Sequence, residues 1–287
     1  MRTAKSFNID NITKFKAQLL EWSKKFNEIV WLDSNSYKQT YGQYNAILAV
    51  DAFTVLSINS ISAFEELKRY QNEINDWIFG YLNYDLKNSI EQLSSSNFDG
   101  LDFPELYMFQ PKRMIFLEAD NVVFKYHETV KNLINSDFKI ISETEIPKKD
   151  KTLKDIKIQP RISKESYLDK VNQMLNYIHR GDIYEANFCQ EFYATNTKIS
   201  PLSVYNHLNK ISKPPFASFV KNGDKYIMSA SPERYLAKRG NQIISQPIKG
   251  TAKRSVNYTE DYTLKHNLKV NSKERSENIM IVDLVRN

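Results

Sequence analysis

The stretch SPERYLAKRGNQIISQPIKGT, which begins at Ser231, gives the clearest structural signal in this chain. Two short runs, residues 233–238 and 242–248, flank an Arg-Gly-Asn turn signal, and this pattern predicts a β-hairpin. The outer ends of such a hairpin face each other. Glu233 and Lys249, sixteen positions apart in sequence, are therefore expected to be neighbours in space.

These two side chains form a chemically useful pair. A neutral lysine amine is a nucleophile, and a protonated carboxylic acid donates a proton. Together, Lys249 and Glu233 supply what the displacement of a hydroxyl group from a small molecule requires. The alternative interpretation is that both are ordinary surface residues beside turns.

A third candidate is Glu277, in a predicted helix that begins at Ser272. Ile281 and Leu284 follow at spacings of four and three, so the carboxylate would share a helix face with two aliphatic side chains. Such a carboxylate is costly unless it is paired or holds a metal, and a site without cysteine or histidine favours Mg²⁺. The alternative is a surface ion pair with Lys273.

The remaining patterns predict a mixed α+β chain. Apolar residues recur at helical spacing in some segments and alternate with polar residues in others. The strands predicted at residues 44–50 and 53–58 are expected to form an antiparallel pair. The predicted helices are 15–26, 62–75, 171–178, 201–212 and the one from 272, and the other predicted strands are 28–33, 77–84, 113–118, 122–126, 184–192, 216–220 and 225–229.

Composition excludes several classes of protein. The 287 residues are 41% hydrophobic, enough for one large domain or two ordinary ones. The net charge of +6 comes from scattered basic residues, so no nucleic-acid partner is expected. A single cysteine, Cys189, excludes an intramolecular disulfide, and the four histidines show no zinc-binding spacing. No apolar run is long enough to span a membrane and no signal-peptide core is present, so we expect a cytoplasmic protein.

Four motifs occur in order, and together they resemble the chorismate-utilising enzymes. They are GDIYEANF at 181–188, SPERYL at 231–236, PIKGT at 247–251 and ENIMIVDL at 277–284. The first half agrees through LDS at 32–34 and WIFGYLNYDL at 77–86. The resemblance covers nearly the whole chain. It implies an α+β fold in which two packed antiparallel β-sheets are flanked by helices.

Lysine at position 249 distinguishes members of this family. Anthranilate synthases carry alanine there, whereas Pro-Ile-Lys-Gly-Thr resembles aminodeoxychorismate synthase component I of the p-aminobenzoate and folate route. The resemblance implies that Lys249 adds to ring carbon 2 of chorismate while Glu233 protonates the departing hydroxyl at carbon 4. Ammonia from a glutamine amidotransferase partner then adds at carbon 4, and the lysine leaves. Gly250 and Thr251 would contact the substrate, and Glu277 would help to hold Mg²⁺.

The resemblance also implies how the chain is organised. Residues 1–146 are expected to form an N-terminal lobe, residues 147–160 a lysine-rich connection, and residues 161–287 the first part of the chorismate-binding catalytic lobe. Family members continue with a second metal carboxylate and most groups that grip chorismate, so we expect a C-terminally truncated chain that is inactive alone. Glu185 and Cys189 stand where relatives show glutamine and a small residue, and neither is given a role.

Two alternatives to the synthase stay open. One is anthranilate synthase component I, for which Lys249 is the wrong residue. The other is a tryptophan-binding regulatory module without catalysis. Relatives hold tryptophan in a cleft of the first lobe, and Ser34, Pro215, Phe216 and Ala217 match positions at that cleft. The same four residues would also suit ordinary core and turn positions.

Overall fold

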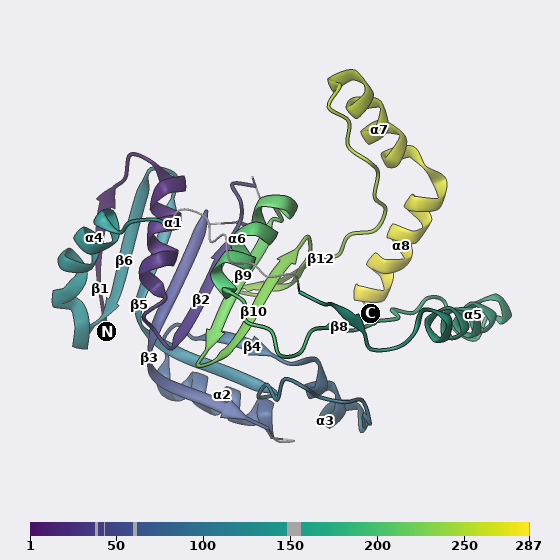
Figure 1. Ribbon diagram of the computed structural model, residues 1–287, viewed down its shortest axis with the longest axis horizontal. Coiled ribbons are helices and arrows are strands. Elements are labelled where there is room, and N and C mark those ends of the chain that lie inside the picture. The colour runs from purple at the N-terminus through teal and green to yellow at the C-terminus, as the bar shows by residue number, and fades with distance from the viewer. Residues whose placement is uncertain (38–39, 43, 60–61, 148–155, 287) are drawn as a thin grey trace. The chain divides into compact units, whose positions relative to one another are not determined.

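The computed structural model describes residues 1–37, 40–42, 44–59, 62–147 and 156–286. Its main element is an eight-stranded sheet whose paired strands are antiparallel (Figure 1). The strand order is β1–β6–β5–β3–β2–β9–β10, with β4 paired to β5. These strands are β1 (Arg2–Asn8), β2 (Glu28–Asp33), β3 (Ala46–Ile58), β4 (Phe79–Leu82), β5 (Leu106–Glu118), β6 (Asn121–His127), β9 (Phe216–Asn222) and β10 (Lys225–Ser231). The predicted α+β class with antiparallel sheets is confirmed, although the described strands form one large sheet and two small ribbons.

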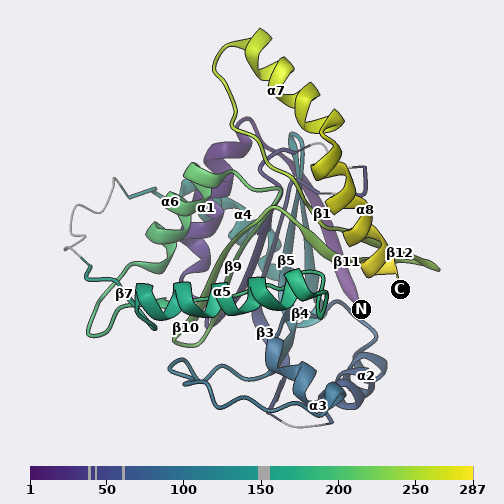
Figure 2. The ribbon, with the colours of Figure 1, turned by 90° about the vertical axis from the view of Figure 1, so that its right-hand side faces the viewer.

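Helices cover one face of the large sheet. Figure 2 shows α1 (Ile12–Ser23), α4 (Ile134–Glu143) and α6 (Pro201–Ser212) on the same side of the strands. Aromatic contacts fix these helices: Phe7 of β1 stacks on Phe138 of α4 at 4.0 Å between ring centroids. The Asn11 side chain caps α1 by accepting a hydrogen bond from the Lys14 amide.

Strand β3 corrects the prediction of two strands at residues 44–50 and 53–58. The chain runs on as one strand, with a bulge against β5 between Ala52 and Thr54, just after Asp51, which has a φ of +64°. Both halves stay paired to β5, and the Asp51 carboxylate forms an ion pair with Arg113. The buried Arg113 also donates to Asp137 at 3.1 Å, so two carboxylates compensate its charge.

Most other local predictions are confirmed, because strong periodicity or a turn signal marks them. The strand at 28–33 is β2, and the Asn222-Gly223 signal joins β9 to β10, with Gly223 at a φ of +61°. The predicted helices include α2 (Ala63–Ile74), α5 (Lys164–Arg180) and α8 (Ser272–Arg286). The helices missed by the prediction are α3 (Lys87–Glu91), α4 and α7 (Tyr258–Val270), together with the 3₁₀ turns η1 (Tyr84–Leu86) and η2 (Glu128–Leu133). None of the described helices is long and apolar enough to cross a membrane.

The chain divides into two compact units, and the large sheet belongs to the first. This unit joins residues 1–146 to residues 205–287, so β9 and β10 share a sheet with strands of the predicted N-terminal lobe. The second unit, residues 147–204, holds α5 and the small ribbon of β7 (Gln159–Pro160) and β8 (Phe192–Tyr193). Most of the predicted lysine-rich connection lies outside the described residues. The proposed lobe boundaries stay a prediction.

The strand predicted at 184–192 is wrong. Residues 183–191 are irregular, and only Phe192 and Tyr193 pair with another strand. The alternation of apolar and polar residues there is therefore not accompanied by strand pairing. Glu185 and the exposed Cys189 lie in this segment.

Candidate functional site

The predicted hairpin is present and brings its two outer ends together. Its strands are β11 (Arg234–Arg239) and β12 (Gln242–Gln246), which pair antiparallel. Glu233 stands immediately before β11, and its Oε1 accepts a hydrogen bond of 2.7 Å from the backbone N–H of Ile248. The carboxylate therefore lies beside the backbone of the residue that precedes Lys249. The predicted proximity is confirmed, whereas the catalytic roles stay predictions.

A short turn holds the backbone of Glu233. The Glu233 amide donates to Oγ of Ser231 at 3.2 Å, and the same hydroxyl donates to the Glu233 carbonyl at 3.0 Å. Pro232 between them restricts the backbone further. Glu233 is exposed and Lys249 is half-buried, so a small molecule can reach the carboxylate. Thr251, a predicted substrate contact, is also exposed.

Helix α8 brings a carboxylate to this site that the sequence prediction missed. Gly250 has a φ of +77°, and a Cβ built on it would lie 2.5 Å from Oε2 of Glu274. The Glu274 side chain thus lies directly over the residue that follows Lys249. Its amide is capped by Oδ1 of Asn271 at 3.1 Å, which fixes the first turn of α8. In the sequence, only the position of Glu274 could have indicated this role, because it stands one helical turn before Glu277 on the same face of the helix.

Glu277 lies on α8 in an ion pair with Lys273, Nζ to Oε1, at 3.6 Å. This is the surface pair considered as its alternative role. Its apolar stripe is only partly buried, because Ile281 is 6% exposed whereas Leu284 is 67% exposed. Among the residues that the structure describes, no group of three or more His, Cys, Asp or Glu side chains could hold a metal. The carboxylate oxygens of Glu277 fit Mg²⁺ in kind, but they do not form a complete site.

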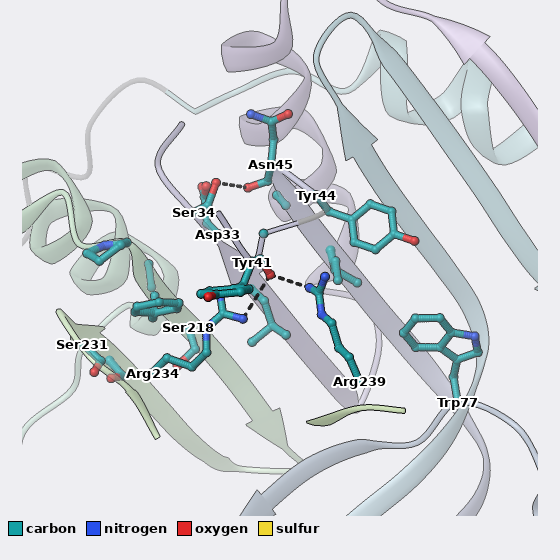
Figure 3. Close-up of a pocket in the computed structure, with 18 residues that line it drawn as sticks. Asp33, Ser34, Tyr41, Tyr44, Asn45, Trp77, Ser218, Ser231, Arg234 and Arg239 are labelled. Carbon is teal, nitrogen blue, oxygen red and sulfur yellow. Dashed lines mark hydrogen bonds between the residues drawn. The ribbon is translucent and has the colours of Figure 1, made fainter. Parts of the chain in front are cut away.

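A cavity of about 520 Å³ opens beside the hairpin in the first unit (Figure 3). Its volume is in the range of small-molecule pockets, which is roughly 300–1,000 Å³. All four residues of the predicted tryptophan cleft, Ser34, Pro215, Phe216 and Ala217, line it. The structure therefore brings together residues that are about 180 positions apart in sequence.

The loop after β2 forms one wall of the cavity. Oγ of Ser34 donates to the Asn45 carbonyl at 3.0 Å, which ties this loop to the start of β3. The Asn35 side-chain amide donates to the Pro214 carbonyl at 2.7 Å, which ties the loop to the turn before β9. Asn35 has a φ of +50°, a conformation that asparagine tolerates better than most residues. Two cross-links from neighbouring residues thus hold the wall.

The charged side chains that line the cavity include more cations than anions. Asp33 is its one carboxylate among the described lining residues, and Lys16 pairs with it at 2.7 Å. Arg234 and Arg239 of the hairpin also line the cavity, and both donate to the backbone carbonyl of Tyr41, Arg234 at 3.2 Å (Figure 3). The sequence prediction missed both arginines. Their only available signal was that Arg234 adjoins Glu233.

Comparison with known proteins shows the family to which this chain belongs. The family model described as chorismate binding enzyme matches residues 27–287. The anthranilate synthase component I-like protein of Synechocystis sp. is 35% identical, over 74% of this chain and 44% of that protein. Aminodeoxychorismate synthase component 1 of Klebsiella aerogenes is 36% identical, over 44% of this chain and 28% of that protein. The chain spans less than half the length of each of these two relatives.

Solved structures agree on the fold. Anthranilate synthase component I from Streptococcus pneumoniae superposes with a TM-score of 0.67 at 18% identity, covering 88% of this chain and 62% of that one. The menaquinone-specific isochorismate synthase MenF from Escherichia coli gives a TM-score of 0.58 at 12% identity, covering 99% of this chain and 63% of that one. Identities this low support a common fold and nothing finer.

Proposed function

Because this chain belongs to the chorismate-binding enzymes, we propose that it acts as component I of an aminodeoxychorismate synthase. In this proposal, chorismate and ammonia give 4-amino-4-deoxychorismate and water. A glutamine amidotransferase partner supplies the ammonia. The proposal is supported by lysine at position 249 and by relatives of that name, such as the Klebsiella aerogenes protein.

The observation that carries the proposal is the contact between Glu233 and the Ile248 amide. It places a carboxylate at the end of the hairpin where Lys249 emerges, so one substrate can meet both side chains. Oε1 is held by the amide, which leaves Oε2 as the oxygen to carry a proton toward a leaving group. Glu233 immediately precedes β11 and Lys249 follows β12, so the pairing of these two strands brings the two residues to the same end of the hairpin.

The proposed steps balance in atoms and electrons. The neutral Lys249 amine forms a bond to ring carbon 2, the ring double bond shifts, and the bond from carbon 4 to its hydroxyl oxygen breaks. Glu233 gives its proton to that oxygen, which leaves as water. Ammonia then bonds to carbon 4, the electrons return, and the bond from carbon 2 to Lys249 breaks. The ammonium group formed at carbon 4 returns one proton to Glu233, and Lys249 leaves as a neutral amine, so the enzyme is regenerated.

The proposed reaction also uses Mg²⁺, and Glu277 is the residue proposed to help bind it. Bound Mg²⁺ would neutralise the ring carboxylate of chorismate. Glu277 would supply one oxygen ligand after it leaves Lys273, and Mg²⁺ commonly uses one or two protein carboxylates together with substrate oxygens.

Product analysis tests the reaction. The protein at its full natural length is incubated with chorismate, an ammonium salt and Mg²⁺, and the products are separated by chromatography. We expect 4-amino-4-deoxychorismate and no anthranilate. Lys249→Ala should abolish the product, whereas Lys253→Ala, which removes an exposed lysine four positions on, should retain it. Anthranilate as the product, or a fully active Lys249→Ala protein, would contradict the proposal.

A second candidate function is the binding of tryptophan as a regulatory or structural ligand. The specific observation in its favour is that Ser34, Pro215, Phe216 and Ala217 share one cavity. Titration with tryptophan and with chorismate separates this from catalysis. Binding of tryptophan without turnover of chorismate would favour the regulatory module over the synthase.

A further inference from the structure

The residues between β12 and α7 have no regular secondary structure (Figure 1). They are residues 247–257, and because they include Lys249 we call them the Lys249 segment. Since no strand pairing fixes the path of this segment, contacts made by side chains have to hold it in place. Near its start, the Ile248 amide is bound by Glu233. The far end of the segment is held as well, by a residue with no role in the reaction described above.

Asp261, in the first turns of α7, holds this far end. Its two carboxylate oxygens accept from Arg254, Nε to Oδ1 at 2.7 Å and Nη2 to Oδ2 at 2.8 Å. Oδ1 also accepts from the backbone N–H of Ser255 at 3.0 Å. A bidentate contact of this kind fixes the direction of the partner as well as its distance. We call these three hydrogen bonds the Asp261 clip.

Neighbouring contacts stiffen the clip. Oγ of Ser255 donates to Oε2 of Glu260 at 2.6 Å and accepts from the Asn257 amide at 3.1 Å. Oδ1 of Asn257 in turn accepts from the Glu260 amide at 3.1 Å and caps α7. The first turn of α7 and the end of the Lys249 segment are therefore tied together by side chains from both.

Helices α7 and α8 lead from the clip back to the start of the segment. Asn271 alone separates the two helices, and its amide and carbonyl form backbone hydrogen bonds of 2.9 and 3.1 Å to one helix each. Glu274 of α8 then lies over Gly250. The same two helices thus contact the Lys249 segment at Gly250 and again at Arg254. Two separated contacts restrict the direction of the segment, which a single contact cannot do.

We propose that Asp261 is a positioning residue, and that its clip keeps the Lys249 segment alongside α7 and α8. The catalytic consequence rests on the proposed function. When the clip opens, the far end of the segment is released, so Lys249 and the carboxylates of α8 can take up other arrangements. Groups that are misplaced react more slowly even where the substrate still binds. A carboxylate is required at position 261, because the amide of an asparagine would turn an N–H group toward one of the donors.

Amide hydrogen exchange, followed by NMR on the 287-residue chain, tests the position of the segment without any turnover. In Asp261→Asn, the Ser255 amide should exchange faster because its acceptor is weakened. The Ile248 amide, at the other end of the segment, should also exchange about two- to fivefold faster, as expected for loss of an exposed ion pair. Glu128→Gln is the matched control: it removes a 2.7 Å ion pair with Lys131 elsewhere in the first unit and should change neither amide. Faster exchange at Ser255 with an unchanged Ile248 amide would show that the clip acts only locally, and would overturn the proposal.

Arg254→Gln opens the same clip from its other side. It should also speed exchange of the Ile248 amide about two- to fivefold. Added to Asp261→Asn, it should cause little further change, because the two residues act through one contact. Additive effects of the two substitutions would overturn the clip. If Asp261→Asn does not fold, Arg254→Gln alone decides the outcome.

Turnover of chorismate by the protein at its full natural length tests the catalytic consequence. Asp261→Asn should lower kcat about two- to fivefold with little change in KM, and Glu128→Gln should keep both. Hydrogen bonds from Arg254 and from the Ser255 amide lower the pKa of Asp261 to about 2, so this carboxylate is ionised at neutral pH. The pH profile of kcat should therefore keep its shape in Asp261→Asn.

Two results of the turnover assay would overturn the positioning role. One is an unchanged kcat in Asp261→Asn although the Ile248 amide exchanges faster. The other is a shifted pH profile, which would indicate that Asp261 transfers a proton. If the unchanged protein makes no 4-amino-4-deoxychorismate, the proposed function fails, and the exchange measurements still decide whether the clip holds the Lys249 segment.

Discussion

Replacing Gly250 by alanine tests the contact between helix α8 and the Lys249 turn. Two effects in the folded state act on this position, and a third acts through the unfolded chain. The φ of +77° is unfavourable for any residue with a Cβ. The new Cβ would also lie 2.5 Å from Oε2 and 3.3 Å from Cδ of Glu274, so the carboxylate must move away.

The size of each term follows from the geometry. A left-handed backbone costs an L-residue roughly 1–2 kcal/mol, and alanine restores about 0.4–1 kcal/mol by restricting the unfolded chain. Forcing the Glu274 side chain from its rotamer adds about 0.5–1.5 kcal/mol. We therefore expect Gly250→Ala to lower the free energy of unfolding by about 1–2 kcal/mol. Gly223→Ala is the matched control, with a φ of +61° and nothing within 4 Å of its added Cβ, and it carries the backbone term alone.

Chemical denaturation followed by tryptophan fluorescence measures these differences. The chain's three tryptophans, Trp22, Trp31 and Trp77, lie in the same unit as Gly250 and report on its unfolding. Glu274→Ala removes the carboxylate, and in that background Gly250→Ala should cost no more than Gly223→Ala. If Gly250→Ala costs the same with and without the Glu274 side chain, the carboxylate does not lie over Gly250 and the reasoning is refuted.

Three further measurements test other parts of the molecule. Glu233→Gln should lower turnover of chorismate by about 10²–10⁴-fold with little change in affinity, and the reverse pattern would make Glu233 a binding residue. Burial raises the pKa of Asp76, but hydrogen bonds from Arg2 and Gln110 outweigh this effect, so the pKa in the folded state is lowered. The ionised Asp76 carboxylate therefore stabilises the fold fully at pH values above its unfolded-state pKa of about 3.9. That stability is lost as the pH falls through the lowered folded-state pKa, so thermal unfolding of Asp76→Asn should depend less on pH below about 4, and parallel curves would contradict this. Glu277→Gln should weaken Mg²⁺ binding in the presence of chorismate by calorimetry, and an unchanged affinity would place the metal elsewhere.

The sequence predicted what is locally encoded. The Asn222-Gly223 turn, strand β2 and helix α8 carry their own periodicity or turn residues, and their bounds match or nearly match the structure. The single strand β3 was predicted as two because Asp51 interrupts its apolar pattern. Only the distant pairing with β5, which no local signal reveals, shows that the strand continues.

The candidate site divides in the same way. Glu233 and Lys249 belong to one hairpin, so a local pattern was enough to predict that they meet. Arg239 and Tyr41 are 198 positions apart, and strict alternation would place Arg234 and Arg239 on opposite faces. The register shift between Arg234 and Ala237 in the pairing of β11 with β12 reverses the alternation, and no particular residue type in the sequence marks it. The cavity arginines therefore required the structure.

The hairpin is held at both ends by contacts with other parts of the first unit. At its open end, Glu233 binds the Ile248 amide and Glu274 lies over Gly250. At its other end, Arg239 binds the Tyr41 carbonyl. One small hairpin therefore links the residues around Lys249 to the loop at Tyr41.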